Sequence, residues 1–81
     1  MKLLYSYRFR KAYADAPPQV RKAFDKQARL LAESLRHPSL QAKKYDDTRD
    51  IWQARVNRDW RFYFTIEGDA YHLHEIIPHP K

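Results

Sequence analysis

The sequence predicts an α+β fold, in which a small antiparallel β-sheet of three or four strands carries an N-terminal helical hairpin on one face. Three observations predict it. Apolar and polar residues alternate near the N-terminus, as is typical of a strand. Apolar residues then recur every three or four positions after Pro18, and from Lys43 the period changes to two. The expected order is β-α-α-β-β-β, in one domain that covers residues 1–81.

The first strand is expected over Leu3–Phe9, where aromatic and aliphatic residues occupy every second position. A short helix should follow, because Phe9, Ala12 and Tyr13 fall at helical spacing. The run Ala16-Pro17-Pro18 ends this helix, since proline lacks an N–H and restricts the residue before it.

The second helix has the clearest pattern in the chain. Pro18 suits its first turn, and one apolar stripe follows at helical spacing. The stripe consists of Val20, Phe24, Ala28, Leu31 and Leu35. The helix should end near Arg36-His37-Pro38, where cations favour a helix C-terminus and proline stops it. The two helical segments therefore form a hairpin with prolines at its corner.

The last three strands should be joined by two tight turns. We expect strands over Ile51–Val56, Trp60–Ile66 and Ala70–Ile77, with turns at Asn57–Asp59 and Glu67–Asp69. The second turn contains Gly68, the one glycine in the chain, which takes positive φ without strain. Alternation places Trp52, Phe62 and Phe64 on the face that packs against the helices.

Composition excludes several classes of protein. There is no cysteine, which excludes disulfides, thiolate catalysis and cysteine zinc sites, and a single glycine excludes phosphate-binding loops that need several. No apolar run is long enough to span a membrane, so we expect a cytoplasmic protein without a membrane partner. Sixteen Lys and Arg against ten Asp and Glu give a net charge of +6, which fits a polyanionic partner such as nucleic acid.

The charge is expected to gather on the sheet face that the helices leave open. Alternation places four residues on this face: Gln53, Arg55, Arg61 and Tyr63. Four more residues, all basic, lie at the ends of the same strands: Lys43, Lys44, Arg49 and Arg58. Fixed cations bind phosphates and aromatic rings stack on bases, so this face could bind RNA. A solvated sheet face would carry the same residue types, because Arg and Tyr keep their polar ends in water. The pattern alone leaves both readings open.

Other chemistry has little support in the sequence. His72 and His74 share a strand face, but no third ligand stands at a recognisable spacing, so we expect neither a metal nor a cofactor. What remains is arginine, lysine, histidine and tyrosine around a phosphate. That set suffices for RNA cleavage by the strand's own 2′-hydroxyl, which needs a base, a cation to stabilise the phosphorane and an acid.

The ordered set of segments resembles the RelE/ParE superfamily of toxins from bacterial toxin–antitoxin systems. The similarity covers nearly the whole chain: the aromatic first strand, Ala16-Pro17-Pro18, Leu35-Arg36-His37-Pro38, Leu40-Gln41-Ala42-Lys43-Lys44, Ile51-Trp52-Gln53-Ala54-Arg55-Val56, Asp59-Trp60-Arg61-Phe62-Tyr63-Phe64 and Leu73 to His79. The resemblance implies an endoribonuclease that cleaves mRNA, on the ribosome, and so inhibits translation. It also implies a cognate antitoxin protein, which should be acidic or amphipathic.

By this resemblance, Arg61 would hold the scissile phosphate, Arg55 would support it, and His79 would exchange a proton. RNA would also contact Lys43, Lys44, Arg49, Gln53, Arg58 and Tyr63. The chain departs from the RelE pattern in two places: Gln53 stands at a basic position, and no tyrosine matches the family's C-terminal one before Lys81. Two alternatives therefore stay open, a ParE-like toxin that binds DNA gyrase without nuclease activity and an inactive relative.

Overall fold

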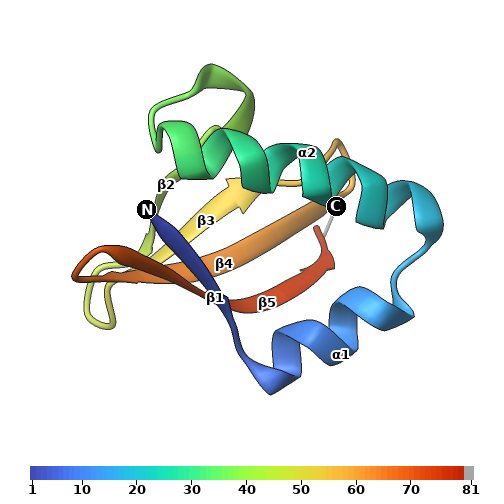
Figure 1. Ribbon diagram of the computed structural model, residues 1–81, viewed down its shortest axis with the longest axis horizontal. Coiled ribbons are helices and arrows are strands. Elements are labelled where there is room, and N and C mark those ends of the chain that lie inside the picture. Colours follow the sequence, from blue (N-terminus) through green and yellow to red (C-terminus); the bar gives the residue numbers. More distant parts are fainter. Residues whose placement is uncertain (80–81) are drawn as a thin grey trace.

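Over residues 1–79, which the computed structural model describes, the chain forms one sheet, two α-helices and a short 3-10 helix (Figure 1). In chain order these are β1 (Lys2–Tyr5), α1 (Tyr7–Asp15), α2 (Pro18–Glu33), the 3-10 helix η1 (Pro38–Leu40), β2 (Lys43–Asp46), β3 (Ile51–Arg55), β4 (Trp60–Glu67) and β5 (Ala70–Pro78). The α+β class is confirmed. The expected strand count is too low, because β2 and β1 both join the sheet and make it five-stranded.

The sheet is mixed rather than antiparallel throughout. Its strand order is β1-β5-β4-β3-β2; β2 to β5 form an antiparallel meander, and β1 pairs with β5 in parallel. The connection between the two sheet edges explains this. The helices carry the chain from β1 at one edge to β2 at the other, and the meander returns so that β5 runs alongside β1 in the same direction. Parallel neighbours need a long crossover of this kind.

The N-terminal strand is shorter than its alternation predicts, because Ser6 caps a helix at that point. The Ser6 hydroxyl accepts a hydrogen bond from the Phe9 amide at 3.0 Å, and the Ser6 amide donates to the Leu73 carbonyl at 3.0 Å. A side-chain acceptor at this position satisfies one of the free N–H groups of a helix start. The chain therefore leaves β1 after Tyr5, and Phe9 enters the core from α1.

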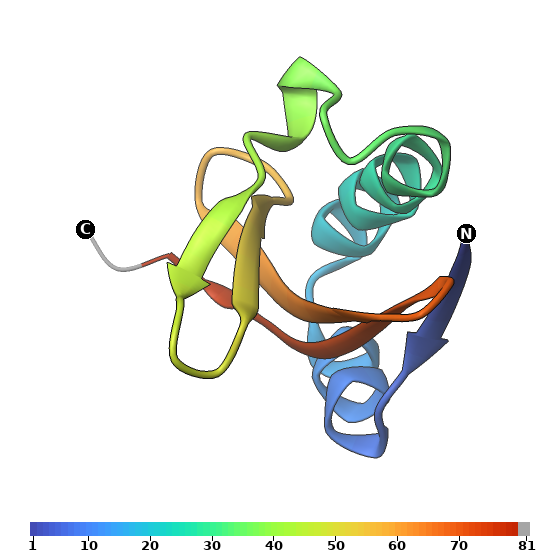
Figure 2. The same cartoon turned by 90° about the vertical axis from the view of Figure 1, so that its left-hand side faces the viewer.

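Both helices contribute to one core on the predicted face of the sheet. The Phe24 ring of α2 packs edge-on against Phe62 with the ring centres 5.2 Å apart, and Phe9 of α1 lies 5.1 Å from Phe24. Phe62 and Phe64 are fully buried, so the orientation of β4 is confirmed. Figure 2 shows the helices on one side of the picture, with β2, β3 and the C-terminal end of β5 on the other.

Both predicted turns of the meander are confirmed. The Asn57 side-chain oxygen accepts hydrogen bonds from the amides of Asp59 and Trp60, at 2.9 and 3.0 Å, which closes the turn between β3 and β4. Gly68 has a φ of 61° in the turn before β5. In the part of the chain that the structure describes, no helix is long and apolar enough to cross a membrane.

The core makes a direct prediction about stability. Phe64→Ala should lower the free energy of unfolding by about 3–5 kcal/mol, because it removes a fully buried ring and leaves a cavity. Denaturant unfolding of the two proteins measures the difference. Tyr7→Ala is the control: Tyr7 is 70% exposed, so its loss should change stability by about 0.5 kcal/mol or less. A loss below about 1 kcal/mol for Phe64→Ala would contradict the assigned core.

Candidate active site

A cavity of about 150 Å³ opens where β2, β3, β4 and the end of β5 come together, and its mouth is on the sheet face opposite the core. We call it the cationic cavity. It is lined by Gln41, Lys43, Gln53, Ala54, Arg55, Arg61 and His79. Arg55 and Arg61 lie on neighbouring strands, and His79 follows Arg61 by 18 positions. The fold thus brings together the three residues with predicted catalytic roles.

Strand register sets the positions of these side chains. Arg55 of β3 lies directly opposite Arg61 of β4, and Lys43 of β2 lies opposite Gln53 of β3. His79 joins them because its backbone amide donates to the Asp59 carbonyl at 2.6 Å, which holds the end of β5 beside the β3–β4 turn. Each of three adjacent strands therefore supplies one cation to the cavity.

Within residues 1–79, no acidic group neutralises the positive charge of the cavity. No carboxylate lines it, and none of the ion pairs within residues 1–79 includes Lys43, Arg55 or Arg61. Like charges directly opposite each other on neighbouring strands repel, and Arg55 faces Arg61 in this way. A bound anion would remove that repulsion. Arginine in particular suits phosphate, because its planar fork can donate two parallel hydrogen bonds.

The Arg61 guanidinium is oriented by the turn that precedes it. Its Nη1 donates to the carbonyls of Asn57 and Trp60, at 2.6 and 2.9 Å. Arginine has five N–H donors, and the hydrogen bonds within residues 1–79 use only those on Nη1. The N–H groups on Nε and Nη2 can therefore donate to an anion. The sequence predicted Arg61 as a free cation and gave no sign of this tether to the turn.

Gln53 and Tyr63 lie on the predicted face, but the expectation that they are open to solvent is wrong. They are 7% and 8% exposed, and the Gln53 side-chain amide donates to the Tyr63 hydroxyl at 2.9 Å. They are cross-strand partners, and the ring of Tyr45 packs edge-on against Tyr63 with centres 5.0 Å apart. The pair forms a wall of the site rather than an open stacking surface. Contact of either residue with RNA stays a prediction.

Lys44 lies away from the cationic cavity. Its ammonium group forms an ion pair with Asp50 at 2.8 Å and stands 5.6 Å from the centre of the Trp52 ring. The hydrogen bond that its ammonium group donates to Asp50 raises the pKa of Lys44 above its ordinary value. Lys44 is the strand partner of Trp52, which packs against the core, so alternation directs it to the other face of the sheet.

Arg49 and Arg58 are also outside the cavity. Arg49 forms an ion pair with Asp46 at 2.9 Å and lines a different hollow on the same sheet face. Arg58 is exposed in the β3–β4 turn and, with Lys26 and Arg55, lines a third hollow beside α2. Apart from Lys44, the predicted RNA contacts thus line three hollows, the cationic cavity among them, and their contact with RNA stays a prediction.

Sequence reasoning missed a buried glutamine that supports the site. Gln27 on α2 is 4% exposed, and its side-chain amide donates to the carbonyls of Arg55 and Ser39 at 2.8 and 3.0 Å. Its carbonyl oxygen accepts from the Ser39 hydroxyl at 3.2 Å. These bonds join α2 and η1 to the last residue of β3. The available signal was a polar residue at an apolar stripe position, three residues after Phe24.

The histidines on β5 have partners other than a metal. His72 lies 3.4 Å from the Glu67 carboxylate, and His74 lies 2.9 Å from the Thr65 hydroxyl. Across residues 1–79, no three histidine or acidic side chains are close enough together to hold a metal ion.

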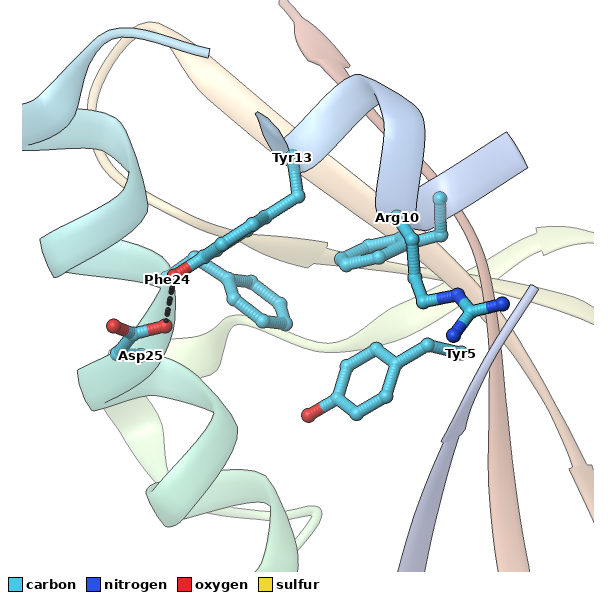
Figure 3. A pocket seen from close by; sticks show the side chains of 6 residues that line it. Tyr5, Arg10, Tyr13, Phe24 and Asp25 are labelled. Carbon is cyan, nitrogen blue, oxygen red and sulfur yellow. Dashed lines mark hydrogen bonds between the residues drawn. The ribbon is translucent and has the colours of Figure 1, made fainter. Parts of the chain in front are cut away.

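A separate groove of about 400 Å³ lies on the helix side of the molecule, between β1, α1 and α2 (Figure 3). Its walls are mainly aromatic, from Tyr5, Phe9, Tyr13 and Phe24. The Tyr13 hydroxyl donates to Asp25 at 2.8 Å, which raises the pKa of Tyr13. This groove has the character of a surface for apolar side chains, whereas the cationic cavity has that of an anion site.

The buried glutamine gives a second stability prediction. Gln27→Leu keeps the side-chain volume but leaves the part-buried carbonyls of Arg55 and Ser39 without their donor, so it should cost about 1–3 kcal/mol in the free energy of unfolding. Gln19→Leu, at an exposed position of the same helix, should change it by about 0.5 kcal/mol or less. Denaturant unfolding compares the two. Equal stabilities of the two variants would show that the hydrogen bonds of Gln27 do not contribute to the free energy of unfolding.

Comparison with known proteins identifies the fold. No protein-family model matches the sequence, and no curated protein is similar enough in sequence to be matched. Among solved structures, the YoeB/ParE toxin from Agrobacterium tumefaciens superposes with a TM-score of 0.81 at 13% identity, over 99% of this chain and 100% of that one. A chain of the Escherichia coli DinJ–YafQ toxin–antitoxin complex superposes with a TM-score of 0.77 at 18% identity, over 96% and 91%.

A third structure, a chain of the archaeal RelE–RelB complex from Pyrococcus horikoshii OT3, superposes with a TM-score of 0.77 at 17% identity, over 95% of this chain and 92% of that one. The chain therefore has the fold of the YoeB/ParE, YafQ and RelE structures over nearly its whole length. The resemblance inferred from the sequence is confirmed at the level of the fold.

Proposed function

We propose that this chain is the toxin of a toxin–antitoxin system and that it cleaves mRNA on the ribosome, in the cytoplasm. The observation that carries the proposal is the cationic cavity, where three cations and a histidine surround a space that no carboxylate of residues 1–79 lines. The fold supports it by analogy, since structures of this fold are toxins and two of them come from complexes with antitoxins.

The positions of the three cations and of His79 support a role for each of them in cleavage. Arg61 and Arg55, opposite each other on adjacent strands, would hold the scissile phosphate between them, with Lys43 at the next strand. As the RNA 2′-hydroxyl attacks phosphorus, negative charge grows on the phosphorane oxygens. Donors fixed before the reaction stabilise such charge most effectively. The tether of the Arg61 Nη1 to the turn supplies that fixation.

Proton transfer would fall to His79. Among the lining residues within 1–79, it is the one whose side-chain type exchanges protons readily near neutral pH. Arginine stays charged and glutamine does not titrate. His79 would donate a proton to the 5′-oxygen as the P–O bond to that oxygen breaks, or accept the proton of the 2′-hydroxyl as the new P–O bond forms.

One observation favours a different activity. Gln53 stands where RelE-like nucleases have a basic residue, and its amide is buried and bonded to Tyr63. It therefore adds neither charge nor a proton acceptor to the cavity. A ParE-like toxin that binds DNA gyrase without cutting RNA would tolerate this, and so would an inactive relative.

We also propose that the partner is an acidic or amphipathic antitoxin that covers the cationic cavity. Because the charges in the cavity are unpaired within residues 1–79, the attraction should be strongly screened by salt. The dissociation constant should rise by at least about tenfold between 0.1 and 1 M NaCl, where the screening length falls from about 10 to 3 Å. Titration of the toxin with its antitoxin at both salt concentrations measures this. Salt-independent binding would place the antitoxin in the aromatic groove of Figure 3 instead.

Arg61→Ala tests the nuclease. Cleavage of mRNA on translating ribosomes should fall by about 100-fold or more, the scale of losing one fixed donor to a developing oxyanion. Stability should fall by about 1 kcal/mol or less, because Arg61 is half-buried and water can replace its bonds to the turn. Arg29→Ala on the exposed side of α2 is the control and should leave cleavage unchanged.

His79→Ala separates the two candidate activities. It should impair mRNA cleavage if His79 moves a proton, and it should leave DNA breaks by gyrase unchanged if the toxin acts there. If Arg61→Ala unfolds most of the protein while cleavage survives in the folded fraction, Arg61 is structural and its proposed catalytic role is rejected. Absence of mRNA cleavage by the folded wild type would reject the nuclease.

A further inference from the structure

A second hollow, of about 510 Å³, lies on the same sheet face as the cationic cavity. We call it the tyrosine hollow, after Tyr45 and Tyr63 in its wall. The two spaces share a boundary, because Tyr63 lines the tyrosine hollow and its hydroxyl accepts the hydrogen bond from Gln53, which lines the cavity. A ligand that extends from the cavity across this pair enters the hollow.

Two irregularities in the sheet flank the hollow. On β2 the pairing with β3 skips Tyr45, and on β5 the pairing with β4 skips His74. Each is the extra residue of a bulge, and both line the hollow. Bulges turn a side chain away from regular alternation and are frequent beside functional sites. Two of them on opposite sides of one hollow indicate a built concavity rather than a gap between side chains.

The exposed aromatic surface of this face belongs to Tyr45. It is 61% exposed, and the edge-on contact with Tyr63 holds its ring in place. Ile51 and Ile77 add apolar surface to the hollow. An aromatic wall, an apolar floor and adjoining cations are the features with which proteins hold the bases of single-stranded nucleic acid.

We propose that the tyrosine hollow binds a nucleobase of the RNA whose phosphate occupies the cationic cavity, and that the base stacks on Tyr45. The inference rests on the proposed function and adds to it a base-binding subsite. It reassigns stacking from Tyr63, which the sequence indicated, to Tyr45, which the sequence did not indicate as a functional residue.

The polar rim of the hollow suits the edge of a base. Glu75 lines it, with a side chain that is 32% exposed and bonded to Arg8 at 3.1 Å. An ionised carboxylate accepts hydrogen bonds and donates none. It therefore favours bases with an exocyclic amino group, such as adenine and cytosine, over uracil, whose ring N–H lies between two carbonyl oxygens that a carboxylate repels. Glu75 is thus the specificity-determining residue of this subsite.

Binding of short RNAs tests the subsite without relying on cleavage. The probes are fluorescein-labelled pentanucleotides of A, C or U, with 2′-O-methyl groups that block the reaction, and an abasic pentamer with the same phosphates. Tyr45→Ala should weaken binding of the A and C pentamers by about 5- to 150-fold, the range for losing one base–aromatic stack. Tyr45→Phe should bind within about twofold of the wild type, because it keeps the ring.

Controls separate stacking from charge and from folding. Tyr45→Ala should leave the affinity for the abasic pentamer unchanged, whereas Arg61→Ala should weaken all four probes. Tyr45→Leu keeps an apolar contact with Tyr63 and should behave like Tyr45→Ala. Tyr7→Ala removes an exposed tyrosine outside the hollow and should bind like the wild type. Glu75→Gln should reduce the preference for the A and C pentamers over the U pentamer.

The outcomes distinguish this inference from the proposed function. If Tyr45→Ala and Tyr45→Leu bind every probe with wild-type affinity while Arg61→Ala binds more weakly, the subsite is overturned. The proposed nuclease activity is not affected by that result. An equal loss on the abasic pentamer also overturns it, because no base is there to stack. Wild-type protein that binds none of the probes rejects RNA as the ligand, and the proposed function fails with the subsite.

Discussion

The pairing of β3 with β4 is the constraint on which both the core and the site depend. This register places Ala54 opposite Phe62 on the inner face and Arg55 opposite Arg61 on the outer one. A shift by one residue would turn every side chain to the other face. It would expose the phenylalanines and bury the arginines. The register that buries the phenylalanines therefore also places Arg55 beside Arg61 on the outer face.

That arrangement has an energetic cost which the protein does not offset internally. Within residues 1–79, Arg55 and Arg61 face each other with no acidic partner, although the chain pairs several of its other cations with carboxylates. Unpaired like charges at one place oppose folding slightly and favour an anionic ligand strongly. A charge distribution of this kind favours an anionic ligand, which is consistent with the proposed binding of an RNA phosphate.

One side of the site is tied to the core by hydrogen bonds, and the other side is exposed to solvent. Gln27 connects α2 to the backbone of Arg55, and the β3–β4 turn holds the Arg61 guanidinium by its carbonyls. Core packing is thereby transmitted to the two arginines through hydrogen bonds. Tyr45 and His79 are exposed, and each stands at an irregularity: a bulge for one, the residue after β5 for the other. Two fixed arginines beside the more exposed Tyr45 and His79 suit the proposed binding of single-stranded RNA.

The sequence by itself determined the α+β class, the start and apolar face of α2, the two turns of the meander and the inward face of β4. Local signals suffice for these features, because proline, Gly68, the Asn57 turn and the period of apolar residues act within a few positions. Alternation also placed Arg55 and Arg61 on one sheet face and the resemblance added His79; all three line one cavity, and their catalytic roles stay predictions. The end of α2 was predicted too late, since the helix stops at Glu33 and not near Arg36-His37-Pro38. Alternation predicted too long an N-terminal strand. The strand ends after Tyr5 because Ser6 caps α1, and the Ser6 amide donates to the carbonyl of distant Leu73.

Only the tertiary structure decided the remaining features, because each depends on contacts between distant segments. The parallel pairing of β1 with β5 joins residues about seventy positions apart, and no local period records it. The burial of Gln53 and Tyr63 follows from their cross-strand bond and from the cover that Tyr45 provides. Tyr45 itself is placed by a bulge, whose single extra residue breaks the alternation on which a sequence-based assignment of faces relies.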